Sequence, residues 1–199
     1  MRKIEKNYEN FFDDFLIDIA EYVSPFFYKL KFTPNDITTL SLITGLASVY
    51  FLYKQNIVLF SILWIVSYFF DCLDGHFARK YNMVTKFGDL YDHVKDISVY
   101  LLFTIVLFIV FRQKQYFYYA LVVIILFLIL AHVHLMCQQT LYNGANSNDE
   151  FLDFLKNIFR ILYVNDENCK EVIQYTKYFG VGTLHLIVVL SILVLHFTN

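Results

Sequence analysis

The chain has 199 residues, of which 58% are hydrophobic and 17% are charged, and its formal net charge is −2. Soluble domains carry about 25% charged residues, so this composition predicts a chain that crosses a membrane several times. The balanced charge offers no basic surface for a nucleic acid partner, and the few glycines and prolines exclude collagen-like and linker sequences.

The first predicted element is an amphipathic segment within residues 1–32. Its apolar side chains recur at helical spacing, and acidic side chains take much of the opposite face: Phe11, Phe12, Phe15, Leu16, Ile19, Val23 and Phe26 against Asp13, Asp14, Asp18 and Glu21. Such a segment is typical of a helix that lies in the membrane interface. Packing against the chain's own helices explains the same pattern. We expect residues 1–32 to precede a transmembrane domain formed by residues 33–199.

The membrane-spanning part of the chain is predicted from stretches without Asp, Glu, Lys or Arg. A spanning helix needs about 20 mostly apolar residues. Five stretches qualify once their helical flanks are included: 37–53, 55–70, 97–111, 115 to about 137, and 178–199. The fold class expected is therefore an all-α, polytopic transmembrane helix bundle.

The sequence marks where the first spanning helix begins, and only a short joint connects it to the second. Thr33 can cap it, Pro34 suits its first position, and Asp36 can complete a capping box with Thr33. The joint at residues 54–55 then predicts a tight antiparallel hairpin. Nine basic residues fall on the side of the N-terminus and three on the other side. This asymmetry favours a cytoplasmic N-terminus, in the endoplasmic reticulum or another inner membrane.

Between the fourth and fifth spans the sequence becomes polar. Residues 142–150 are rich in Asn, Asp, Ser and Gly and are predicted to form a loop. Residues 151–164 are apolar but carry three charges, which favours a second interfacial helix. Residues 165–177 are predicted to be a solvated linker.

The acidic residues that suggest chemistry lie between the second and third spans, where residues 71–96 read DCLDGHFARKYNMVTKFGDLYDHVKD. Asp71 and Asp74 share a face of one helix, and Asp92 and Asp96 share a face of the next. A hairpin can bring the four carboxylates together, and hard cations such as Mg²⁺, Mn²⁺ or Ca²⁺ would keep them ionised. Solvated acidic residues at helix ends are the plainer interpretation of any one of them.

The residues after Asp74 suit a phosphate ligand. Gly75 and Ala78 lack bulk on the following turn, so a ligand can approach the backbone there. Arg79 offers a planar, forked cation for phosphate oxygens. Carboxylates, divalent cations and an arginine together predict metal-assisted phosphoryl transfer.

The spacing Asp-x2-Asp-Gly-x2-Ala-Arg-x8-Gly-x3-Asp-x3-Asp resembles the signature of the CDP-alcohol phosphotransferase family. All eight fixed positions match: Asp71, Asp74, Gly75, Ala78, Arg79, Gly88, Asp92 and Asp96. The resemblance implies a homodimeric membrane enzyme with six spanning helices and a polar cavity that opens to the cytoplasm. The count of five stretches departs from that number.

The resemblance also implies roles for residues. Two divalent ions, Mg²⁺ or Mn²⁺, are expected on Asp71, Asp74 and Asp92 with Asp96 nearby, and Asp96 is expected to be the base that deprotonates the acceptor alcohol. The CDP moiety is expected beside Asp71, Asp74, Gly75, Ala78, Arg79 and Gly88. The sequence Pro-Asn-x2-Thr at residues 34–38 resembles the family's start of the first helix, which implies that Asn35 also reaches the nucleotide.

Two segments disagree about the subclass. Gly75-His76, Asn82, Thr85 and Phe87-Gly88 resemble phosphatidylinositol synthases. Residues 88–93, which end in Asp92-His93, look more like choline and ethanolamine phosphotransferases, and Ile97 stands where phosphatidylinositol synthases typically have Arg. The short chain favours the first group.

We therefore expect transfer of a phosphatidyl group from CDP-diacylglycerol to a small acceptor alcohol, with release of CMP. The alternatives are an aminoalcohol phosphotransferase that uses diacylglycerol as acceptor, and a catalytically inactive membrane relative. A carrier or channel is disfavoured because its charges would be spread through the bundle. His93 lies beside the Asp92/Asp96 face and is a further candidate for the site.

Overall fold

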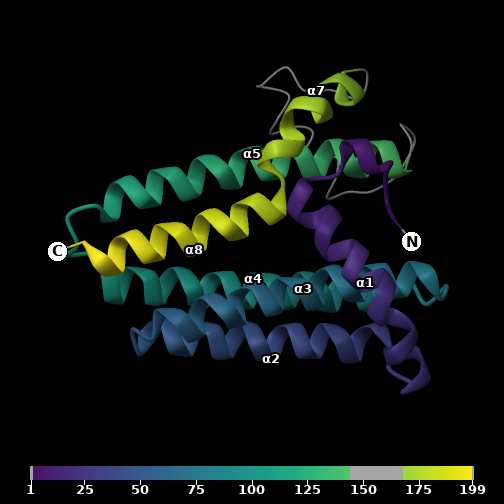
Figure 1. The fold of residues 1–199 in the computed structure, drawn as a ribbon, viewed down its shortest axis with the longest axis horizontal. Coiled ribbons are helices and arrows are strands. Elements are labelled where there is room, and N and C mark those ends of the chain that lie inside the picture. Colours follow the sequence, from purple (N-terminus) through teal and green to yellow (C-terminus); the bar gives the residue numbers. More distant parts are fainter. Residues whose placement is uncertain (1, 144–167, 199) are drawn as a thin grey trace. The chain divides into compact units, whose positions relative to one another are not determined.

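A computed structural model of the chain describes residues 2–143 and 168–198. Within these ranges every regular element is helical (Figure 1): η1 (Lys6–Tyr8), α1 (Phe11–Lys29), α2 (Pro34–Tyr53), α3 (Ile57–Lys80), α4 (Lys86–Phe111), α5 (Phe117–Asn143), α7 (Cys169–Thr176), η3 (Lys177–Phe179) and α8 (Val181–Phe197). Five described stretches are long and apolar enough to cross a membrane: Pro34–Tyr53, Ile57–Lys80, Lys86–Phe111, Phe117–Tyr142 and Cys169–Phe197. The predicted fold class is confirmed.

The chain divides into two compact units. The first comprises Met1, Phe15–Val122 and Val188–Asn199, and the second comprises Arg2–Asp14 and Val123–Ile187. In the first unit α2 packs along both α3 and α4 (Figure 1). All the residues predicted to form the site belong to this first unit.

The predicted start of α2 is confirmed. The backbone N–H of Thr33 donates to Asp36 Oδ2 at 2.8 Å, and the backbone N–H of Asp36 donates to Thr33 Oγ1 at 3.3 Å. The hairpin between α2 and α3 is as tight as expected. Gln55 takes a left-handed conformation with φ of 56°, and the Asn56 side chain caps α3 by accepting from the N–H of Leu59.

Small side chains let α2 approach α3 and α4 closely. Ser41 Oγ donates to the carbonyl of Ser67 at 2.9 Å, and Ser67 Oγ donates to the carbonyl of Ser41 at 2.8 Å. A Cβ atom on Gly45 would lie 2.9 Å from Ser67 Oγ and 3.1 Å from Val99 Cγ2. In membranes such small residues and hydroxyl pairs are the usual means of close helix packing. They pack α2 closely against α3 and α4, the two helices that carry the acidic motif.

Helix α1 confirms the amphipathic pattern and shows where its apolar face goes. Ala20 is fully buried in a cluster with Ile37, Leu73 and Phe77. Phe15 and Phe26 remain 57% and 62% exposed. The face around Ala20 therefore packs on α2 and α3, which is the alternative that the sequence left open.

The predicted solvated linker over residues 165–177 is wrong where the structure describes it. Cys169, Ile173 and Thr176 are buried on one face of α7, and Cys169 and Ile173 pack in a cluster with Val133 and Met136. These three positions are spaced four and three residues apart, which is one helix face. Their burial outweighs the flanking charges, which point to the other side of the short helix.

Other boundaries differ by a few residues. Helix α5 continues past Cys137 to Asn143, so the predicted loop cannot begin at residue 142. Helix α8 begins at Val181 and not at residue 178, because a 3-10 turn precedes it and Gly180 is extended. The rest of the predicted loop and the predicted interfacial helix at 151–164 lie outside the described residues.

Candidate active site

The turn between α3 and α4 is built from local signals in the sequence. Asn82 has a positive φ of 55°, a conformation that Asn tolerates better than most residues, and the N–H of Met83 donates to the carbonyl of Ala78 at 2.8 Å. This is a Schellman-type helix end. Thr85 Oγ1 then accepts from the N–H of Gly88 at 3.0 Å and caps α4. The short turn folds the acidic end of α3 back against the acidic start of α4.

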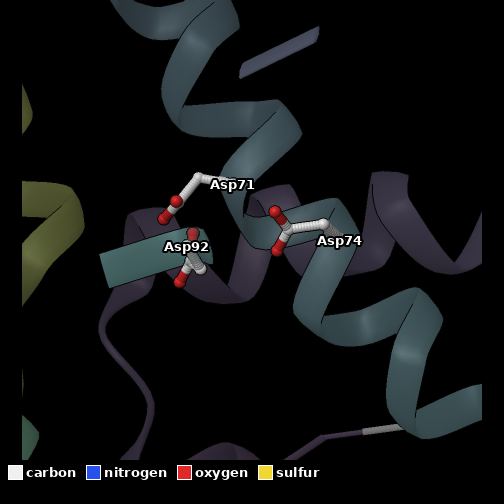
Figure 2. Close-up of side chains that lie close together, drawn as sticks. All are labelled: Asp71, Asp74 and Asp92. Carbon is white, nitrogen blue, oxygen red and sulfur yellow. The ribbon is translucent and has the colours of Figure 1, made fainter. Parts of the chain in front are cut away.

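Three of the predicted carboxylates converge across this hairpin. Asp71 and Asp74 come from α3 and Asp92 from α4, and one oxygen of each lies within 4.8 Å of the others (Figure 2). Three convergent carboxylates repel one another unless cations lie among them, and they fit a hard divalent cation. These residues could hold one such ion.

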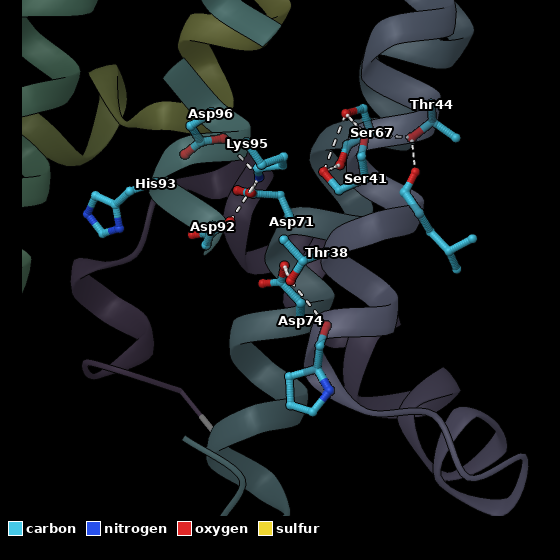
Figure 3. A network of polar contacts seen from close by, with 12 residues as sticks. Thr38, Ser41, Thr44, Ser67, Asp71, Asp74, Asp92, His93, Lys95 and Asp96 are labelled. Atoms are coloured by element: carbon cyan, nitrogen blue, oxygen red, sulfur yellow. Dashed lines mark hydrogen bonds and ion pairs between the residues drawn. The ribbon is translucent and has the colours of Figure 1, made fainter. Parts of the chain in front are cut away.

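Asp74 is the most buried of the three, with 6% of its surface exposed. Thr38 Oγ1 on α2 donates to Asp74 Oδ2 at 2.6 Å (Figure 3). Sequence reasoning did not place Thr38 in the site, although Thr38 is the threonine of the Pro-Asn-x2-Thr segment. The hydroxyl orients one oxygen of Asp74, so the other stays available toward Asp71 and Asp92.

Lys95 is a second residue that sequence reasoning missed. Its side chain is only 3% exposed, and its ammonium pairs with Asp71, with Asp92 Oδ1 at 3.0 Å and with Asp96 Oδ1 at 2.8 Å (Figure 3). A buried charge is tolerated when opposite charges surround it. The available signal was its position, three residues after Asp92 and directly before Asp96.

The predicted nucleotide-binding residues fall into two neighbouring groups. A Cβ atom on Gly75 would lie 3.1 Å from Arg79 Nη1, so the guanidinium extends over this glycine, which directly follows Asp74. A Cβ atom on Gly88 would lie 3.2 Å from Asn35 Oδ1, so the amide at the start of α2 reaches the start of α4. Ala78 is half-buried on the α3 turn that carries Arg79.

The two candidates for a base differ in their surroundings. The side chain of Asp96 is 44% exposed and is paired with Lys95. His93 is exposed, and its Nδ1 lies 2.6 Å from the carbonyl of Asp89 on its own helix. Asp96 therefore adjoins the carboxylate cluster directly, and His93 makes its described contact away from it.

Known proteins with similar sequences include an Arabidopsis thaliana protein named probable CDP-diacylglycerol–inositol 3-phosphatidyltransferase 2, 31% identical over 56% of this chain and 47% of its own length. The archaetidylinositol phosphate synthase of Pyrococcus horikoshii is 38% identical over 34% of this chain and 36% of its own. The CDP-diacylglycerol–inositol 3-phosphatidyltransferase of Candida albicans is 27% identical over 78% of this chain and 71% of its own.

The match to the first two relatives is thus local, because the chain spans about half of their length or less. No solved structure matches the chain significantly. Residues 31–197, which include every described residue of the candidate site, match the profile of the family described as CDP-alcohol phosphatidyltransferase. The chain therefore belongs to the CDP-alcohol phosphatidyltransferase family and is an integral membrane protein of five or more spanning helices, of which five lie in the described residues.

Proposed function

We propose that the chain transfers a phosphatidyl group from CDP-diacylglycerol to a small polyhydroxylated alcohol of the inositol class and releases CMP. The observation that carries the proposal is the convergence of Asp71, Asp74 and Asp92 beside Arg79 at the α3/α4 hairpin. The names of the Arabidopsis and Candida relatives support the donor and the acceptor class.

The proposed roles follow the positions of the side chains. Asp71, Asp74 and Asp92 would hold Mg²⁺ or Mn²⁺, which when bound would neutralise charge on the diphosphate of the donor. Arg79 would bind a phosphate oxygen over the open backbone of Gly75. Asn35, Ala78 and Gly88 would line the remainder of the CDP site, at the ends of α2, α3 and α4.

The transfer itself needs one proton acceptor. We assign this role to the Asp96 carboxylate, which takes the proton of the acceptor hydroxyl as its oxygen forms a bond to the phosphorus of the phosphatidyl group. The bond from that phosphorus to the CMP oxygen breaks, and CMP leaves. General-base assistance of this kind is typically worth about 10² to 10⁴ in rate.

The second candidate function is transfer from a CDP-aminoalcohol to diacylglycerol, and the Asp92-His93 segment favours it. The two functions differ in which half of the donor is retained in the lipid product. The arrangement proposed around either reaction is a homodimer with the site open to the cytoplasm. An inactive relative would keep the carboxylates and show neither reaction.

The test is release of CMP by the purified chain in detergent with Mg²⁺, from CDP-diacylglycerol with inositol and from CDP-choline with diacylglycerol. We expect release from CDP-diacylglycerol, and Asp96→Asn should lower turnover at least about 100-fold while the dissociation constant for the donor changes little. The matched control is Asp89→Asn, an exposed carboxylate on the same helix. Release from CDP-choline alone would replace the proposal by the second candidate, and release from neither would refute both.

A further inference from the structure

The ammonium of Lys95 lies between three of the four carboxylates of the acidic cluster. It contacts Asp71 from α3 and Asp92 and Asp96 from α4, and its side chain is almost entirely buried (Figure 3). A lysine ammonium has three N–H donors and no acceptor, and it meets three carboxylates. One ammonium is therefore ion-paired with three carboxylates at once.

The four carboxylates form two overlapping sets. Asp71, Asp74 and Asp92 bring their oxygens within 4.8 Å of one another. Asp71, Asp92 and Asp96 surround Lys95. Only Asp74 and Asp96 distinguish the sets, so a divalent cation in the first set is a direct neighbour of the ammonium in the second.

A second divalent cation cannot share the second set with the ammonium. The two like charges would repel each other at that separation, and the ammonium, whose side chain is 3% exposed, is poorly screened by water. Expelling the ammonium would also remove all three carboxylates from a buried lysine, and an unpaired buried charge is expensive. The geometry therefore favours the ammonium of Lys95, and not a second divalent cation, as the positive charge between Asp71, Asp92 and Asp96.

We propose that Lys95 supplies the second positive charge of this site, so that the chain binds one divalent cation, at Asp71, Asp74 and Asp92, instead of the two that the family resemblance implies. The inference deepens the proposed function, because it rests on the same carboxylates. Its cation count is nevertheless measurable without any turnover.

The experiment counts Mn²⁺ bound to the full chain in detergent micelles, by equilibrium dialysis with metal analysis and by the electron paramagnetic resonance signal of the remaining free Mn²⁺. The natural chain should bind one Mn²⁺ per chain at saturation. Lys95→Met, which keeps most of the length of the side chain and removes its charge, should bind two. Its first Mn²⁺ should also bind at least ~10-fold more tightly, because a nearby repelling charge is gone.

The matched control is Lys54→Met, which removes an exposed lysine from the joint between α2 and α3 and should still bind one Mn²⁺. Lys95→Gln provides the same comparison if the Met variant does not fold, as judged by its elution and melting temperature. Two ions on the natural chain, or one ion on a folded Lys95 variant without charge, would overturn the proposal. Failure of CMP release with the expected ion counts would refute the proposed function alone.

Discussion

The hydroxyl of Thr38 and the carboxylate of Asp74 form a contact that an isosteric substitution can test. Thr38 and Asp74 are 3% and 6% exposed, and 2.6 Å separates Thr38 Oγ1 from Asp74 Oδ2. A hydrogen bond to a charged group contributes about 1.5–3 kcal/mol. Thr38→Val should therefore weaken Mn²⁺ binding, by about 10-fold or more, because Asp74 is left without its oriented donor.

Thr38→Ser is the control for this prediction, since it keeps the hydroxyl and loses one methyl group. It should bind Mn²⁺ within a few-fold of the natural chain. The measurement is the dissociation constant of Mn²⁺ with the melting temperature of each variant recorded beside it. Equal affinities for Thr38→Val and Thr38→Ser would show that Asp74 does not depend on Thr38 for its position.

For single residues, the sequence predicted which aspartates form the site, but it did not predict that Lys95 lies among them. Spacings of three and four place Asp71 with Asp74 and Asp92 with Asp96 on common helix faces, and the structure brings Asp71, Asp74 and Asp92 together. Lys95 could not be predicted in this way. Its burial depends on how α4 is rotated against α3, and a charged residue in a sequence is ordinarily expected to be solvated.

An ionic contact joins helix α1 to α3, which carries Asp71 and Asp74. Glu21 Oε2 lies 2.8 Å from His76 Nε2, and Glu21 Oε1 lies 2.6 Å from the ammonium of Lys80, which also donates to Ser24 Oγ. The hydrogen bond from Lys80 and its charge hold the pKa of the Glu21 carboxyl below its ordinary value of 4.5. The contact is thus favourable when Glu21 is ionised.

This pKa shift predicts a pH dependence. A carboxyl whose pKa is lower in the folded chain stabilises the fold above its unfolded pKa, and the stabilisation is lost as the pH falls through the folded pKa. Hydrogen-exchange protection of α1 should therefore decrease below about pH 4.5, where Glu21 begins to be protonated. Because Glu21 is 57% exposed, the change should be small.

Glu21→Gln isolates the contribution of this carboxyl from other groups that titrate at low pH. The variant should show reduced protection of α1 already at pH 7 and a smaller further loss at pH 4. Glu171→Gln, an exposed residue of α7, is the control and should behave as the natural chain does. If the hydrogen-exchange protection of α1 in Glu21→Gln equals that of the natural chain at both pH values, the ionic contact of Glu21 does not stabilise α1.

Among the elements, the long apolar helices were predictable and the short one was not. Uncharged stretches of sufficient length predict α2, α3, α4 and α5 because crossing a bilayer requires them. Helix α7 has only eight residues and three buried positions. Short helices are marginal in isolation and depend on their packing partners, and the apolar surface against which α7 packs is not visible in its own sequence.

The orientation of the whole chain in the membrane decides which compartment supplies its water-soluble substrate. The α2/α3 joint lies at one end of these helices and the α3/α4 turn at the other (Figure 1). The asymmetry of basic residues predicts that the turn, and with it the acidic cluster, lies on the cytoplasmic side. Cysteines introduced one at a time in place of Lys54 and Lys86 report the two ends, because both lysines are exposed.

With the chain in a bacterial inner membrane, Lys86→Cys should react with a membrane-impermeant maleimide only in inside-out vesicles, and Lys54→Cys only in intact cells. The natural chain supplies the blank, since its Cys137 and Cys169 are buried and its Cys72 is half-buried. Detergent-solubilised samples of both variants should react fully, which shows that each thiol is accessible. The reverse pattern would place the acidic cluster outside the cytoplasm. Because inositol-class alcohols and CMP are charged or strongly hydrated and do not cross the bilayer, acceptor supply and CMP release would then have to occur on that other side.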